Sequence, residues 1–244
     1  MKNQSIKHFL FLTVIFLMFV NINTQAQNKQ VKIACIGNSI TYGSHLEDSE
    51  RDCYPTQLSN LLYKVYGHNC VVKNFGVSGR TMLKKGPKPI WVEPKFSEAK
   101  NMAPDICIIL LGTNDSRPDL WAKIGKEFYG DYKSMIKTFK KINPKTKFIV
   151  GLPSPIWKNH PYGGTAWGDK HNDSILVNGV IPNIKKIAKK RNVTSIDFHT
   201  PFENKVDLFP DYLHPNAEGA KIIAQMIFDI IEEKNMIQKV INKK

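Results

Sequence analysis

Three residues have the types and the spacing of an activated nucleophile: Ser39 near the start of the chain, and Asp211 and His214 near its end. A serine hydroxyl attacks a carbonyl carbon only when a base removes its proton, and histidine can do this at neutral pH. The histidine needs an acceptor that fixes its tautomer and stabilises the imidazolium. Because Asp211 stands three residues before His214, one short turn can present both side chains together. The pattern indicates acyl transfer.

Such a reaction also requires hydrogen-bond donors for the oxyanion of the tetrahedral intermediate. The backbone N–H groups of Ser39 and Gly79 could supply two donors, and the side-chain amide of Asn114 a third. Glycine at position 79 would let a substrate approach the backbone closely. Each residue also has a structural explanation, because serine caps helices, glycine occupies turns and asparagine bridges loops.

Strand-like and helix-like segments alternate along the chain and would bring these residues together. We expect strands at 31–36, 70–75, 105–111, 147–152 and 193–198, and helices at 55–66, 126–142, 173–190 and 216–233. Strands separated by helices predict a parallel sheet with helices on both faces. Sites in such sheets lie beyond the carboxyl ends of the strands, and that is where the candidate residues stand.

Four short sequence blocks resemble, in the same order, the four blocks of the SGNH (GDSL-type) hydrolases: GNSIT (37–41), NFGVSG (74–79), GTND (112–115) and DYLHPNAEG (211–219). The resemblance implies an α/β fold, a flavodoxin-like three-layer α/β/α sandwich with a five-stranded parallel sheet. It also implies that Ser39 is the nucleophile, that Gly79 and Asn114 are oxyanion donors, and that Asp211 and His214 complete the triad.

One position departs from the pattern of the family. The first block often reads Gly-Asp-Ser, whereas position 38 is Asn in this chain. The aspartate of the family supports hydrogen bonds within the loop and is not a triad member. Since asparagine can accept and donate similar bonds, we expect activity to be retained.

The stretch 86–121, with KPIWVEP and GTNDSRPDLW, more narrowly resembles exported Bacteroidetes-type esterases of the sialate O-acetylesterase-like and carbohydrate acetylesterase-like groups. This resemblance implies removal of O-acetyl groups from a glycan through an acyl-enzyme, with no metal and no organic cofactor. Arg80, Trp157 and Trp167 are candidate substrate contacts. Aromatic rings can stack on sugars, but packing of the rings and pairing of Arg80 with a carboxylate are equally open.

Other functions remain as alternatives. A lipase or phospholipase-type acyl ester hydrolase would require a larger apolar rim around the active site. The residues near the candidate site are mostly polar and aromatic. A catalytically silent glycan-binding module on the same fold is disfavoured by the intact triad. An α/β-hydrolase would need Gly-x-Ser-x-Gly, but position 41 is Thr. A nucleotide-binding sheet would need Gly-x-Gly-x-x-Gly after the first strand, and the sequence lacks it there.

The N-terminal residues 1–26 have the pattern of a secretory signal peptide, with a basic start, an apolar run from Phe9 to Val20 and small residues before Ala26. We therefore expect a secreted protein, periplasmic or extracellular, with one domain over 27–244 and no membrane span in its mature form. An exported protein can form disulfides, and Cys53 and Cys70 could pair, although their spacing does not decide this.

The formal net charge is +14, and much of it falls on two predicted helices and the C-terminal tail. Lysines repeat at 133–141, 185–191 and 239–244, as expected of solvated helix faces. No nucleic-acid-binding motif accompanies the charge, so an acetylated glycan is the expected partner, and not a nucleic acid. The sequence leaves the oligomeric state open.

Overall fold

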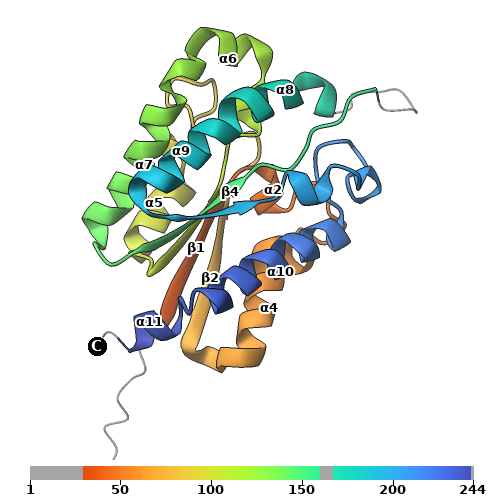
Figure 1. Cartoon of the computed structure of the whole chain (residues 1–244). Coiled ribbons are helices and arrows are strands. Elements are labelled where there is room, and N and C mark those ends of the chain that lie inside the picture. Colours follow the sequence, from red (N-terminus) through yellow and green to blue (C-terminus); the bar gives the residue numbers. More distant parts are fainter. Residues whose placement is uncertain (1–29, 160–166, 243–244) are drawn as a thin grey trace, which may run out of the picture.

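Five parallel strands form one sheet in the computed structural model, which describes residues 30–159 and 167–242 (Figure 1). They are β1 (Val31–Gly37), β2 (Cys70–Gly76), β3 (Ile106–Leu110), β4 (Lys147–Leu152) and β5 (Thr194–Asp197). The strand order is β2-β1-β3-β4-β5, the flavodoxin-like order in which the direction of winding reverses between β1 and β3. The predicted five-stranded parallel sheet is confirmed.

Helices cover both faces of the sheet and complete three layers (Figure 1). One face carries α4 (Tyr54–Tyr66) and α10 (Ala217–Glu233), and the other carries α5 (Pro94–Met102), α7 (Phe128–Ile142) and α9 (Ile181–Arg191). Each face has its own hydrophobic cluster, and Ile108 and Ile109 of β3 belong to different clusters. A central strand buried on both sides must be apolar at every position, which explains the continuous apolar run.

Shorter elements connect these layers. The short helices are α2 (Ser39–Tyr42), α3 (Ser49–Asp52), α6 (Pro118–Ile124), α8 (Asp173–Ile175) and α11 (Gln238–Ile241). The 3-10 turns are Gly67–Asn69, Ile90–Val92, Asn114–Ser116, Gly125–Glu127, Trp167–Lys170, Thr200–Phe202 and Val206–Leu208. The periodicity did not predict α5 or α6, which are too short to show an apolar repeat, although each begins with proline, a residue favoured in the first helical turn.

The helix predicted over 173–190 is interrupted in the structure. A π-helical segment, Leu176–Val180, separates α8 from α9. A β-carbon on Gly179 would lie 2.4 Å from the Trp121 ring, so glycine permits close packing of this indole against the segment. Pro182, which has no backbone N–H, lies at the start of α9 directly after this segment. The two residues that weaken the helical pattern in the sequence therefore mark the irregular turn.

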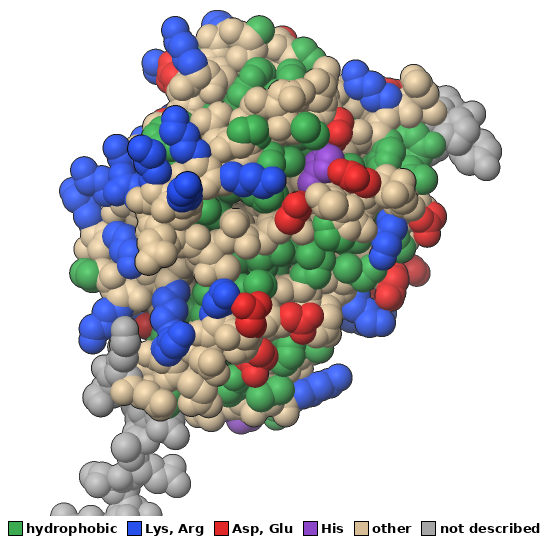
Figure 2. Space-filling model, viewed as in Figure 1, with side chains coloured by type: hydrophobic (Ala, Val, Ile, Leu, Met, Phe, Trp, Pro, Cys, Tyr) green, Lys and Arg blue, Asp and Glu red, His purple; other side chains and the backbone are tan. Residues whose placement is uncertain are grey.

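The surface and the cysteines bear on the remaining expectations. Lys and Arg side chains gather over α7 and α9 (Figure 2), where the lysines are exposed. None of the described helices has the length and apolar character needed to cross a bilayer, and the predicted signal peptide, 1–26, lies outside the described residues.

All four cysteines are free thiols, so Cys53 and Cys70 are unpaired in the structure. Burial raises the pKa of Cys70 to about 12.

Gly76 offers a test of how closely β2 and α2 pack. A β-carbon there would lie 2.3 Å from the backbone nitrogen of Tyr42, so Gly76→Ala must displace the helix that begins at Ser39. We expect a loss of about 1–3 kcal/mol in the free energy of unfolding, measured by urea denaturation. The matched variant is Gly130→Ala in α7, where a β-carbon would meet nothing within 4 Å. Equal midpoints for the two variants would contradict this packing.

Candidate active site

Ser39 lies directly after the first strand, at the carboxyl edge of the sheet. β1 ends at Gly37 and α2 begins at Ser39, with Asn38 as the N-cap. Asn38 Oδ1 accepts a hydrogen bond from the backbone of Ile40 at 3.0 Å, which fixes the turn. As the first residue of a helix, Ser39 has a backbone N–H with no intrahelical partner. The residue is 7% exposed and lines a cavity, so it is largely shielded from water but accessible from that cavity.

Asn38 fills only part of the role expected for it. Its Oδ1 accepts from the loop as anticipated, but among the described residues its buried Nδ2 atom has no hydrogen-bond partner. An unpaired buried amide is costly, so asparagine here does not donate the bond that the sequence suggested it could.

Asp211 and His214 meet Ser39 from the opposite end of the chain. His214 Nε2 lies 2.8 Å from Ser39 Oγ across 175 residues of sequence, and His214 Nδ1 lies 2.6 Å from Asp211 Oδ2. The other carboxylate oxygen, Oδ1, accepts from the backbone N–H groups of Leu213 and His214, at 3.1 and 2.7 Å. Tyr212, the residue after Asp211, has a φ of 64°, an uncommon value for a non-glycine residue. One tight turn therefore presents both side chains.

The environment of Asp211 keeps its carboxyl group ionised. Partial burial raises the pKa, but hydrogen bonds from the His214 side chain and from the backbone of His214 and Leu213 outweigh it, and the pKa lies below its ordinary value. An ionised carboxylate on Nδ1 fixes the tautomer in which Nε2 carries no hydrogen and can accept a proton, and it stabilises the imidazolium that results. The arrangement can therefore withdraw a proton from Ser39 Oγ.

Gly79 and Asn114 line the same cavity as Ser39 and His214. Gly79 has a φ of 77°, a conformation that favours glycine. Asn114 Nδ2 donates to the carbonyl of Arg80 at 3.0 Å, and Asn114 Oδ1 lies 3.3 Å from His171 Nε2. An amide nitrogen has two hydrogens, so a second N–H remains for an oxyanion while the first fixes the side chain.

Asp115 ties the loop of Gly79 to the loop of Asn114. Its two carboxyl oxygens accept from the backbone N–H groups of Met82 at 3.0 Å and Leu83 at 2.8 Å. The side chain is fully buried. Since Asp115 is adjacent to Asn114, and Met82 follows Gly79 by three residues, this carboxyl group sets the spacing of the two expected donors.

Two histidines join the site that the sequence did not single out. His45 stacks on His214 with ring centroids 4.5 Å apart and an interplanar angle of 26°, and its Nδ1 lies 3.9 Å from Asp211 Oδ2. His171 orients the Asn114 amide. The usable signal was their position in the segments after β1 and β4, at the edge that holds the site.

The side chains of His45, Asp211 and His214 each offer a potential metal ligand, all within 4.8 Å of one another. Both ring nitrogens of His214 already contact Asp211 and Ser39. The two imidazole rings are also stacked with an interplanar angle of 26°, so their in-plane lone pairs lie in separate planes. A metal ion would have to open the Asp211–His214 hydrogen bond, so the donor set fits a proton relay better than a metal centre.

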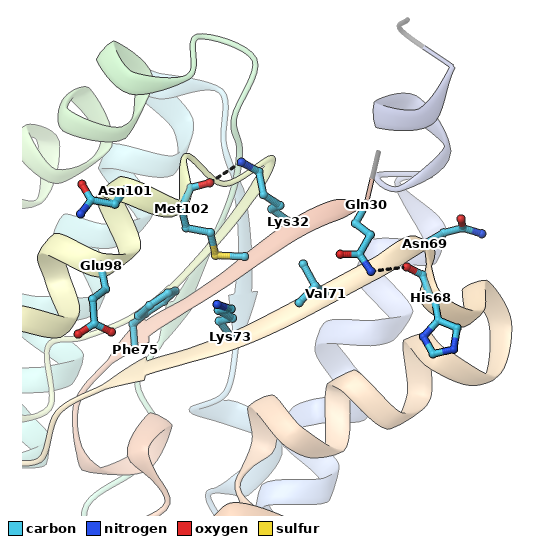
Figure 3. A pocket seen from close by; sticks show the side chains of 10 residues that line it. All are labelled: Gln30, Lys32, His68, Asn69, Val71, Lys73, Phe75, Glu98, Asn101 and Met102. Carbon is cyan, nitrogen blue, oxygen red and sulfur yellow. Dashed lines mark hydrogen bonds between the residues drawn. The ribbon is translucent and has the colours of Figure 1, made fainter. Parts of the chain in front are cut away.

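The cavity at this edge has a volume of about 610 Å³. Its walls come from the segments after β1, β2, β3 and β4 and from the Asp211–His214 turn; they include Ser44, Ser78, Thr81, Pro87, Lys88, Arg117, Asp119, Leu120, Lys170 and Leu213. A larger cavity of about 1090 Å³ lies along the edge strand β2 and α5 (Figure 3). The residues lining that cavity include no serine or cysteine, so the smaller cavity is the candidate active site.

The three expected substrate contacts have other surroundings. Arg80 Nε donates to Glu93 Oε1 at 2.8 Å, and the Trp157 ring packs on Phe209 at a centroid distance of 4.9 Å. Neither is among the described residues that line the cavity. The side chain of Trp167 lies outside the described residues. Binding of substrate by Arg80, Trp157 or Trp167 therefore stays a prediction. In the structure Arg80 pairs with a carboxylate and Trp157 packs against another ring.

Comparison with known proteins gives a family match and one close relative. The sequence model of the GDSL-like Lipase/Acylhydrolase family matches residues 35–222. An acetylxylan esterase from Xylanibacter ruminicola is 36% identical over 215 residues, which are 81% of this chain and 42% of that protein. The chain thus spans less than half the length of this relative.

Solved structures resemble the fold over most of the chain. An acetyl xylan esterase superposes with a TM-score of 0.62 at 18% identity, covering 82% of this chain and 100% of the other. A carbohydrate acetylesterase from Sinorhizobium meliloti superposes with a TM-score of 0.63 at 17% identity, covering 84% and 99%. At such identities the likeness shows the fold, and it supports the predicted three-layer arrangement.

The buried Asp115 predicts a pH dependence of stability. Burial raises its pKa to about 7, although the N–H groups of Met82 and Leu83 favour the ionised form. In the unfolded chain an aspartate titrates near pH 4. Between about pH 4 and 7 the folded protein holds this proton and the unfolded chain does not. Its contribution to the free energy of unfolding therefore falls as the pH rises, by roughly 1.4 kcal/mol per pH unit.

Asp115→Asn should remove this slope, because the amide does not titrate, and should lower stability overall, because an amide nitrogen cannot accept from the second N–H. Urea unfolding at pH 4.5, 5.5, 6.5 and 7.5 measures both effects. The matched variant is Asp229→Asn on the exposed side of α10, which should keep the wild-type slope. A wild-type slope in Asp115→Asn would show that this carboxyl group is ionised throughout.

Proposed function

Since this chain belongs to the GDSL-like lipase/acylhydrolase family, we propose that it is a serine esterase that removes O-acetyl groups from carbohydrates. The observation that carries the proposal is the continuous relay from Asp211 Oδ2 through His214 to Ser39 Oγ, with contacts of 2.6 and 2.8 Å. This relay opens into a cavity that also holds Gly79 and Asn114. A nucleophile, its base and the oxyanion donors thus share one space, as acyl transfer requires.

In the proposed first half-reaction, His214 Nε2 takes the proton of Ser39 Oγ while the oxygen attacks the acetyl carbonyl carbon. The carbonyl oxygen becomes an oxyanion, which the backbone N–H groups of Ser39 and Gly79 and the Asn114 amide stabilise. When the intermediate collapses, the bond to the sugar oxygen breaks and His214 returns the proton to that oxygen. The products are the free sugar hydroxyl and an acetyl group on Ser39.

The second half-reaction repeats the sequence with water. His214 Nε2 takes a proton from a water molecule, whose oxygen attacks the acetyl carbon. The same donors stabilise the second oxyanion, and its collapse releases acetic acid, which ionises to acetate in solution, and restores the proton to Ser39 Oγ. Asp211 stays ionised and stabilises the imidazolium in both halves.

The carbohydrate substrate rests on similarity. The 36% identical relative is an acetylxylan esterase, and two similar structures are an acetyl xylan esterase and a carbohydrate acetylesterase. We extend an acetylated glycan to this chain as its substrate class. The alternative of a lipase draws its support from the cavity, because most of the lining surface is apolar although Lys88, Arg117 and Lys170 also line it.

We further propose that residues 1–26 direct export and that 27–244 form one domain, secreted to the periplasm or the cell exterior. The basic start, the apolar run and the small residues before position 27 support this. An acetylated polysaccharide too large to enter a cell would be met outside it, which agrees with the proposed substrate.

His45 has a place in this mechanism as a positioning residue. Its stacked ring limits rotation of His214, and it covers one side of the Asp211–His214 hydrogen bond on which the base depends. An aromatic contact of this kind contributes about 0.5–1.5 kcal/mol. The exposed ring of His45 would itself face bound substrate, because it lines the cavity.

Ser39→Ala should lower kcat/KM for 4-nitrophenyl acetate by at least about 1000-fold, since the variant lacks the nucleophile. Asp211→Asn should lower kcat by roughly 100-fold or more, because the amide can donate to Nδ1 and so favour the wrong tautomer. The matched variant is Ser195→Ala on β5, an exposed serine away from the site, which should retain wild-type turnover. Wild-type turnover by Ser39→Ala would refute the proposed nucleophile. Binding of glycan by a wild-type protein that turns over no ester would favour the silent module.

His45→Ala should lower kcat for the same ester by about threefold to tenfold, because the ring that restrains His214 is lost. His45→Phe keeps an aromatic ring at this position and should restore most of the rate. Thermal melting of both variants controls for misfolding. If the two substitutions lowered kcat equally, the stacking contact would not be what positions His214.

A further inference from the structure

We propose that a clamp formed by His199 and Asp173 positions the Asn114 amide toward the oxyanion. The clamp acts through His171, which lies two residues before Asp173 and contacts Asn114. The inference rests on the proposed function, since the oxyanion forms only in acyl transfer. It goes beyond that function in naming two positioning residues that are not among the described residues lining the cavity.

The imidazole of His199 lies between two carboxylates, just after β5. The residue is 7% exposed; its Nε2 lies 3.1 Å from Asp173 Oδ1, and its Nδ1 lies 3.2 Å from Glu203 Oε1. Because an ionised carboxylate only accepts, both ring nitrogens donate when both contacts form, and the ring is then an imidazolium. The bond with Asp173 is the largest cause that raises the pKa of His199 above its ordinary value, while burial opposes it and Glu203 adds to it. The bond to Asp173 is therefore charge-assisted, which makes it stronger than a neutral one.

Asp173 connects the start of α8 to the segments that follow two neighbouring strands. Its Oδ1 also accepts from Ile156 N at 2.9 Å, in the segment after β4. His199, in the segment after β5, is itself held by its backbone N–H, which donates to Asp197 Oδ1 at 2.8 Å. Since β4 and β5 pair in the sheet, one carboxylate fixes the start of α8 against the edge of the sheet.

Three consecutive residues lead from this clamp to the expected oxyanion donor. Asp173 belongs to the clamp, and the backbone N–H of Asn172 donates to Ser116 Oγ at 3.5 Å. The ring of His171 then contacts Asn114 Oδ1 at 3.3 Å. Asn114 and Ser116 are the two ends of one 3-10 turn. The segment 171–173 therefore ties the turn that carries the donor to the anchored start of α8.

The direction of the Asn114 amide depends on two of these contacts. Its Oδ1 faces His171 Nε2, and its Nδ2 donates to the carbonyl of Arg80 at 3.0 Å. Together they set the plane of the amide, and with it the direction of the second N–H. A donor to an oxyanion acts mainly in the transition state, where the negative charge develops. A misdirected amide should therefore slow turnover without weakening the binding of substrate.

The experiment measures kcat and KM for 4-nitrophenyl acetate in variants at position 173. Asp173→Ala removes the bonds to both Ile156 and His199. Asp173→Asn keeps an oxygen that can accept them, whereas Asp173→Glu keeps the charge and moves the carboxylate by one methylene. The matched control is Asp229→Ala on the exposed side of α10. Thermal melting identifies a temperature at which the variants compared are folded, and Asp173→Glu replaces Asp173→Ala if the latter does not fold.

Asp173→Ala should lower kcat and kcat/KM alike, by roughly tenfold to 100-fold, because a displaced donor stabilises only the transition state less well. Asp173→Asn should stay within about threefold of the wild type, because the bonds persist without their charge. Asp173→Glu should lose more than Asp173→Asn, and Asp229→Ala should keep the wild-type rate. A rise in KM at unchanged kcat, or an equal loss in Asp229→Ala, would overturn the clamp.

A double-mutant cycle tests the path through Asn114. Asn114→Ala alone should lower kcat by about 100-fold or more, as expected for the loss of an oxyanion donor. In that background the substitution at Asp173 should change kcat by less than about twofold, because no amide remains to be displaced. Fully additive losses would show that Asp173 does not act through Asn114 and would overturn the proposal.

Failure of the proposed function can be told apart from failure of the clamp. If the wild type hydrolysed neither 4-nitrophenyl acetate nor any acetylated oligosaccharide, the esterase proposal would fail. The side-chain amide signals of Asn114 in two-dimensional NMR spectra, identified by their loss in Asn114→Ala, would still decide the clamp, because they require no turnover. Signals that shift in the folded Asp173 variant and not in Asp229→Ala would support the clamp, and unchanged signals would refute it.

Discussion

The contact between His214 Nε2 and Ser39 Oγ depends on nearly everything else in the molecule. It joins residues 175 positions apart at 2.8 Å, and no local element supplies it. Parallel strands place all their carboxyl ends at one edge of the sheet, so the segment after β1 and the segments after the later strands meet there. The strand order with its reversal between β1 and β3 opens the space that Ser39 faces. The sheet therefore brings residues that are far apart in the sequence next to each other, and the contact between Ser39 and His214 results from this.

Buried polar groups then refine the arrangement that the sheet permits. Asp211 closes the turn that presents His214 and also bonds to its ring, so one carboxylate both positions and polarises the base. Asp115 plays the corresponding part on the donor side, where it holds the segment after Gly79 against the segment of Asn114. Both carboxyl groups are partly or wholly removed from water, and hydrogen bonds in such surroundings are costly to leave unmade. That cost is what keeps the loops in one conformation.

The lysine side chains of the protein lie in two different environments. Four lysines of α7 and four of α9 lie on exposed helix faces, where Lys and Arg side chains gather (Figure 2) and are solvated. Lys88 and Lys170 instead line the candidate active-site cavity. Composition counts both kinds alike, so net charge indicates a preference for anionic partners only after the fold shows which cations surround the site.

The sequence by itself determined the class of fold, the five strands within a residue or two of their ends, and the positions of Ser39, Gly79, Asn114, Asp211 and His214 in their segments. Apolar runs, helical spacing and short motifs are local patterns, and they can be read without coordinates. Only the tertiary structure decided that His45 stacks on His214, that His171 orients Asn114, that Arg80 pairs with Glu93 and that Lys88 runs beside Gly79. These contacts depend on how loops of irregular backbone pack against each other, and no periodicity in the sequence encodes the distance between side chains on separate loops.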